Sequence, residues 1–83
     1  MNYLNALNFG SKLLKEHGIN SYILDSELLL ASILKLSREK LLINLDKKIG
    51  KTKYFEYKQI LYRRKKNEPI AYILKKKEFW KYE

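Results

Sequence analysis

Residues 21–31 read Ser-Tyr-Ile-Leu-Asp-Ser-Glu-Leu-Leu-Leu-Ala. This segment contains no Gly or Pro, and either Asn20 or Ser21 at its start can cap a helix. Its two carboxylates lie near the positive end of that helix, where negative charge is stabilising. Apolar residues occupy most sides of the helix, which is typical of a helix at the centre of a bundle. We therefore predict a central helix over residues 22–35.

Helical spacing of apolar residues continues on both sides of this segment. Asn2 and Ser37 can cap helices, Gly18 and Gly50 are placed to end or separate them, and Pro69 suits a first helical position. Gly10 either weakens the first helix or marks a close contact between helices. These signals predict four further helices over residues 3–17, 38–44, 52–66 and 69–74.

The end of the chain has a different pattern, because polar and aromatic residues alternate over 77–82. Alternation of this kind predicts a β-strand, although a single strand without a partner is not stable by itself. The predicted fold class is therefore all-α: a small bundle of four to five helices over residues 1–74, with a strand at the C-terminus.

Eighty-three residues suffice for one small domain. A domain of this size can form a helical bundle or a binding module but leaves little room for an enclosed cofactor pocket. Cysteine is absent, which excludes disulfides and thiolate metal sites. The apolar runs are too short to span a membrane, and the start does not resemble a signal peptide. We expect a cytoplasmic protein.

The net charge of +9 is confined to one half of the chain. Residues 1–46 carry five basic and five acidic side chains, whereas residues 47–83 carry thirteen basic and four acidic ones. Such asymmetry favours an acidic partner, either a nucleic acid or a protein surface. A compositional bias that places lysine at neutral surface positions explains it equally well.

Residues that could carry catalysis are few. His17 is the single histidine, the carboxylates are scattered, and the three glycines do not form a phosphate-binding loop. We therefore predict no catalytic, cofactor-binding or metal-binding residues in this chain. Tyr54, Tyr57 and Tyr62 alternate with basic residues and could stack on bases, but their helical spacing is more typical of a core.

Two segments are more specific. Residues 21–31 resemble the "Leu-Asp-Ala-Glu-Leu-Leu-Leu-Ala" helix of the HemK/PrmC family, the S-adenosylmethionine-dependent glutamine methyltransferases of peptide-chain release factors. Arg63-Arg64, followed by residues 68–74 and 78–80, is similar to that family's "Arg-Arg, Glu-Pro-x-Ala-Tyr-Ile, Glu-Phe-Trp" block. The resemblance extends from about residue 4 to residue 80.

The resemblance implies an N-terminal helical substrate-recognition domain over 1–74, and a start at 75–83 of a β-hairpin linker to a methyltransferase domain. The family's Gly-rich loop for the methyl donor and its Asn-Pro-Pro-Tyr motif are absent from this sequence. The parent enzyme would bind S-adenosylmethionine, whereas this fragment would bind no cofactor and catalyse nothing alone. Lys75 replaces the family's usual Gly, so we expect a different turn before Lys77.

The resemblance also implies partners, namely a release factor as protein substrate and the parent's own methyltransferase domain. We expect the basic cluster Arg63, Arg64, Lys65 and Lys66 to contribute to docking of the release factor. A structural role is expected for the residues that match the family motifs, which are Asp25, Glu27, Glu68, Pro69, Tyr72, Glu78, Phe79 and Trp80. Two alternatives remain open: a free-standing basic module that binds nucleic acid through 47–83, and a purely structural domain.

Overall fold

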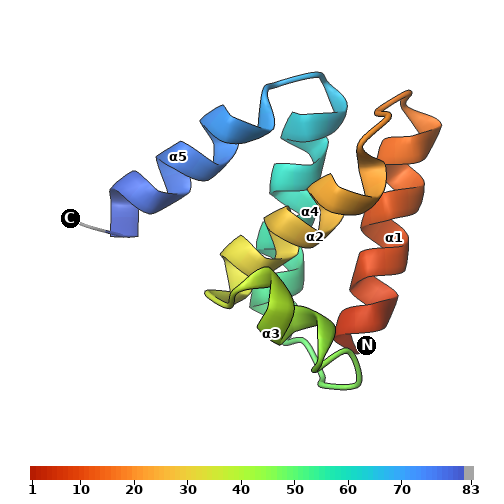
Figure 1. Cartoon of the computed structure of the whole chain (residues 1–83), viewed down its shortest axis with the longest axis vertical. Coiled ribbons are helices and arrows are strands. Elements are labelled where there is room, and N and C mark those ends of the chain that lie inside the picture. The colour runs from red at the N-terminus through yellow and green to blue at the C-terminus, as the bar shows by residue number, and fades with distance from the viewer. Residues whose placement is uncertain (82–83) are drawn as a thin grey trace.

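The computed structural model describes residues 1–81, with side chains for residues 1–75, and this part of the chain forms five helices without a β-sheet. Their bounds are α1 Tyr3–Glu16, α2 Tyr22–Leu34, α3 Arg38–Leu42, α4 Lys51–Lys65 and α5 Ile70–Lys81. The all-α prediction is confirmed. Figure 1 shows α1, α2 and α4 grouped side by side, while α5 leads away from the end of α4.

α2 is the central helix, as its apolar sequence predicts. It contacts each of the other four helices. The side chains of Leu29, Leu30 and Ile33 are almost completely inaccessible to solvent. The N-terminal end of α2 is less covered, because Ile23 and Leu24 are 57% and 43% exposed.

The buried core joins residues from all five helices and the turn after α1. Burial of apolar side chains is the main force that stabilises such a domain. The core consists of Ala6, Leu7, Leu14, Ile19, Leu29, Leu30, Ala31, Ile33, Leu41, Tyr57, Ile60, Leu61 and Ile73.

The predicted starts of α1 and α3 are confirmed in detail. Asn2 accepts a hydrogen bond from the backbone N–H of Asn5 at 2.8 Å, and the Asn5 side chain accepts one from Asn2. At α3, Ser37 Oγ accepts from the N–H of Lys40 at 3.1 Å. These bonds satisfy donors that a helix start otherwise leaves unpaired.

Three helices end with the same backbone arrangement, in which one residue adopts a left-handed conformation. These residues are Gly18 after α1, Lys35 after α2 and Asn67 after α4, with φ of 79°, 59° and 70°. At each end, the next N–H reaches back across the last turn, for example from Leu36 to the carbonyl of Ala31 at 3.0 Å. Glycine at the first site was recognisable from sequence, whereas Lys35 carries no such signal because side chains disfavour this conformation.

Two predictions are corrected. The strand predicted over 77–82 does not form in the described residues, because α5 continues as a helix to Lys81; residue 82 lies outside them. A helix pairs its backbone groups within the segment, whereas a strand without a partner leaves them unpaired. Residues 75–77 are all lysines, so this stretch has no Gly or Pro that would end the helix. In α3, the helical spacing of the sequence predicts that both Leu41 and Leu42 face inward; Leu41 is buried, but Leu42 is 36% exposed.

Candidate functional site

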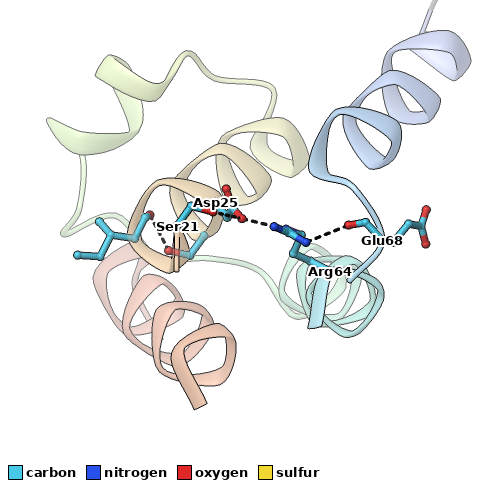
Figure 2. A network of polar contacts seen from close by, with 6 residues as sticks. Ser21, Asp25, Arg64 and Glu68 are labelled. Atoms are coloured by element: carbon cyan, nitrogen blue, oxygen red, sulfur yellow. Dashed lines mark hydrogen bonds and ion pairs between the residues drawn. The ribbon is translucent and has the colours of Figure 1, made fainter. Parts of the chain in front are cut away.

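A buried ion pair lies at the junction of α2, α4 and the turn before α5. Arg64 Nε donates to Asp25 Oδ2 at 2.9 Å, and the two side chains are 15% and 4% exposed. The same carboxylate oxygen accepts a hydrogen bond from Ser21 Oγ at 2.9 Å, and Arg64 Nη1 donates to the backbone carbonyl of Glu68 at 3.2 Å. Figure 2 shows Arg64 between Asp25 and Glu68. Arg64 therefore holds α4 against α2 and fixes the turn from which α5 begins.

Arg63 makes a second ion pair, with the Glu68 side chain. Its Nε donates to Oε1 at 3.0 Å, and Nη2 donates to Oε2. Donation of these hydrogen bonds to the Glu68 carboxylate raises the pKa of Arg63, which is already charged at neutral pH. Because Glu68 lies just beyond the end of α4, this pair reinforces the same turn.

The four basic residues at the end of α4 are thus not equivalent. Arg64 is engaged inside the bundle and Arg63 is paired, whereas Lys66 is exposed. Lys65 is half-buried, with its ammonium 4.6 Å from the centroid of the Tyr62 ring. A lysine over a ring face keeps its charge in contact with solvent. Lys66 is therefore the exposed member of the predicted cluster, and Lys65 is partly exposed, without an ion pair among the described side chains to hold its charge inside the bundle.

Glu27 belongs to a separate ion pair. Its Oε1 accepts from Arg38 Nε of α3 at 2.7 Å. Asp25 and Glu27 therefore point to different sides of α2, one toward α4 and the other toward α3. The two carboxylates do not form a shared site for acid–base chemistry or for a metal.

The three tyrosines that alternate with basic residues have three different environments. Tyr57 is completely buried, and its hydroxyl donates to the carbonyl of Ser26 at 3.0 Å. Burial raises the pKa of this phenol well above its ordinary value. Tyr54 packs edge-on against Phe9, with ring centroids 5.9 Å apart. Tyr62 is 44% exposed.

Phe55 is exposed as well, at 57%, and sequence reasoning did not single it out. Its spacing of seven residues from Tyr62 places both rings on one stripe of α4. The sequence contains a signal for this exposure. Residues 54, 57, 60 and 61 form the apolar stripe of the helix that faces the core, and residue 55 lies outside that stripe.

The described side chains contain no group of three or more histidines and carboxylates that could bind a metal ion. Within the described helices, none combines the length and the apolar character that crossing a membrane requires.

Comparison with known proteins places the chain in a family. The sequence pattern of the PrmC N-terminal domain matches residues 5–74, which is most of the chain. This chain belongs to the PrmC N-terminal domain family.

Its relatives are considerably longer proteins. This chain is 38% identical over 77 residues to a release factor glutamine methyltransferase of Leptospira interrogans, and covers 27% of that protein. It is 43% identical over 56 residues to a protein of the same name from Buchnera aphidicola, covering 20% of it. A bifunctional methyltransferase of Rickettsia felis is 39% identical over 75 residues, or 14% of its length. The alignments cover 93%, 68% and 90% of this chain. No solved structure matches it significantly.

The residues that match the family motifs divide into two groups. Asp25, Glu27 and Glu68 form the ion pairs described above, and Pro69 directly precedes α5. Tyr72 is 49% exposed on the first turns of α5. Glu78, Phe79 and Trp80 lie on the last turns of α5, and their side chains are outside the described part of the chain.

Proposed function

We propose that this chain is the release-factor-docking domain of an S-adenosylmethionine-dependent protein-glutamine N5-methyltransferase. The observation that carries the proposal is the family match, with relatives named release factor glutamine methyltransferase of which the chain covers about a quarter or less. The domain would contact the release factor, and the methyltransferase domain of the parent enzyme would modify the glutamine of its Gly-Gly-Gln loop.

The residues of this chain do not fit the methyl donor. A nucleotide-type cofactor is usually held by a Gly-rich turn between a strand and a helix. Here Gly10 lies within α1 against Tyr57, Gly18 ends that helix region, and Gly50 precedes α4. None of these glycines is part of a strand-to-helix loop. Binding of S-adenosylmethionine is therefore assigned to the parent's other domain.

A docking role agrees with the arrangement of charge. Lys66 is exposed and Lys65 is partly exposed at the end of α4, and the paired Arg63 and Arg64 hold the backbone that carries them. Contacts remote from a reacting group can position a large substrate and so lower the entropic part of the barrier. The proposed docking surface therefore centres on Lys65 and Lys66, with an acidic surface on the release factor as its complement.

The test measures binding of the 83-residue chain to a purified release factor. Reversing both charges, with Lys65→Glu and Lys66→Glu together, is expected to weaken binding about tenfold at low salt, and by less as salt screens the field. The matched control reverses two exposed lysines on other helices, Lys12→Glu and Lys40→Glu, and leaves binding within about twofold.

Two results would contradict the proposal in different ways. Equal weakening by both pairs of substitutions would show that net charge acts without a specific surface. If the chain without substitutions does not bind release factor at all, docking would be excluded and a purely structural role beside the methyltransferase domain would be favoured.

A further inference from the structure

The face of α4 that points away from the core carries two exposed aromatic rings among lysines. We define this outer stripe as Lys51, Phe55, Gln59, Tyr62 and Lys66, which follow one another at helical spacing. Phe55 and Tyr62 are 57% and 44% exposed. The seven residues between them correspond to about 10 Å along the helix axis, which leaves room for a separate base on each ring.

Two further lysines flank the outer stripe on one side. Lys65 lies with Nζ 4.6 Å from the centroid of the Tyr62 ring, and Lys58 lies 5.2 Å from that of Tyr54. These two ammonium groups add positive charge beside the outer stripe, and positive charge that follows the nucleic-acid backbone is one part of single-strand recognition. Glu56 is the single carboxylate of α4, about 100° around the helix from Phe55 on the opposite side from these lysines.

The two exposed rings distinguish this face from the proposed docking surface. All three arginines of the chain, Arg38, Arg63 and Arg64, are engaged in ion pairs within the bundle, so the basic residues left on the α4 surface are lysines. Lysines interleaved with exposed aromatic rings are typical of surfaces that bind a single-stranded nucleic acid.

We propose that the outer stripe of α4 binds single-stranded RNA. Phe55 and Tyr62 stack on bases, while Lys51, Lys58, Lys65 and Lys66 contact phosphates. Gln59, between the two rings, and the Tyr62 hydroxyl supply hydrogen-bonding groups for the ribose 2′-hydroxyl, which DNA lacks. This activity shares Lys65 and Lys66 with the proposed docking surface and adds the two exposed rings, which release-factor docking does not use.

The experiment measures fluorescence anisotropy of a labelled oligouridine of about ten nucleotides with the 83-residue chain. Binding is expected to weaken with salt, with a slope of log K against log salt of about −2 to −3 for three to four phosphate contacts. The double substitution Phe55→Ala with Tyr62→Ala is expected to lower the affinity about tenfold or more at unchanged net charge. The control Tyr72→Ala removes an exposed ring on α5 and leaves the affinity unchanged; circular dichroism verifies that each variant is folded.

Other outcomes would overturn the proposal. Equal affinity for the matching DNA oligomer would remove the assignment to RNA, and equally strong competition by an acidic peptide such as oligoglutamate would assign the face to a protein. Full RNA affinity in the Phe55→Ala/Tyr62→Ala variant would show that charge alone is responsible. This variant is expected to bind release factor within about twofold of the unchanged chain, so the failure of this inference and of the docking proposal are distinguishable.

Discussion

The pair formed by Asp25 and Arg64 joins residues 39 positions apart in the sequence. Removal of water from both charges opposes folding, and the pair is favourable only because the hydrogen bonds from Ser21 and to the Glu68 carbonyl complete the network. Its geometric role is specific, since an arginine can bridge two elements with a rigid set of donors.

Arg64→Ala is expected to lower the free energy of unfolding by about 3 kcal/mol, because it leaves the Asp25 carboxylate buried without its cation. Arg64→Lys keeps the positive charge but lacks the planar set of guanidinium donors. The loss in free energy of unfolding should therefore be smaller than for Arg64→Ala. The double variant Asp25→Leu/Arg64→Met removes both charges and should be more stable than Arg64→Ala. Urea unfolding measures all three variants; an unaltered midpoint in Arg64→Ala would contradict the structural role.

Gly10 offers a second prediction at the scale of one residue. In a helix interior, Gly→Ala ordinarily stabilises by about 1 kcal/mol. Here a Cβ at Gly10 would lie 2.2 Å from Tyr57 Oη and 2.9 Å from its Cζ. Gly10→Ala should therefore destabilise the domain by about 1–3 kcal/mol.

The reason for that loss can be isolated. Tyr57→Phe in the Gly10→Ala background removes the closest atom and should recover part of the stability, whereas Tyr57→Phe alone should cost about 1 kcal/mol through the lost hydrogen bond to Ser26. Thermal unfolding of the four chains gives the coupling between the two sites. A Gly10→Ala chain more stable than the original would show that α1 and α4 are not in close contact.

At the scale of elements, the backbone conformation at each helix end determines the direction in which the chain continues to the next helix. The left-handed conformation that ends α2 is occupied by Lys35, and that arrangement allows Leu36 to bond back to Ala31. The Cβ of a lysine is sterically disfavoured in this conformation, whereas glycine has no Cβ. The lysine at the turn between α2 and α3 therefore does not give the domain its highest stability.

Lys35→Gly is expected to stabilise the domain by about 0.5–1 kcal/mol, because glycine adopts the required φ without strain. The matched opposite change is Gly18→Ala at the end of α1, where φ is 79°. This substitution is expected to lower the free energy of unfolding by a similar amount. Differential scanning calorimetry would measure both. Destabilisation by Lys35→Gly would mean that the lysine side chain makes a contact that outweighs its backbone strain.

At the scale of the whole molecule, a net charge of +9 is held within a radius of gyration of 11.8 Å. Repulsion among these charges opposes the compact state. The pair between Asp25 and Arg64 is buried, and salt screens such pairs much less than exposed charges.

Raising the salt concentration from about 0.01 to about 0.3 M should therefore increase the unfolding temperature by several degrees, since screening weakens the repulsion more than the pairs. Lys12→Glu/Lys40→Glu, which lowers the net charge by four, should raise the midpoint in low salt and reduce its dependence on salt. A midpoint that falls with added salt would show that attractive pairs dominate the electrostatic free energy.

The sequence alone determined the fold class, the central place of α2, and the starts of α1 and α3, because these depend on local periodicity and capping residues. Only the tertiary structure decided which charges are available for a partner. It places Arg64 inside the bundle with Asp25 and leaves Lys66 exposed and Lys65 partly exposed. It also exposes Phe55 and Tyr62 while burying Tyr57. Each of these outcomes depends on contacts between residues far apart in the chain, and a local pattern does not contain such contacts. The helical course of residues 77–81 has the same origin, since a strand pattern becomes a strand only where another strand can pair with it.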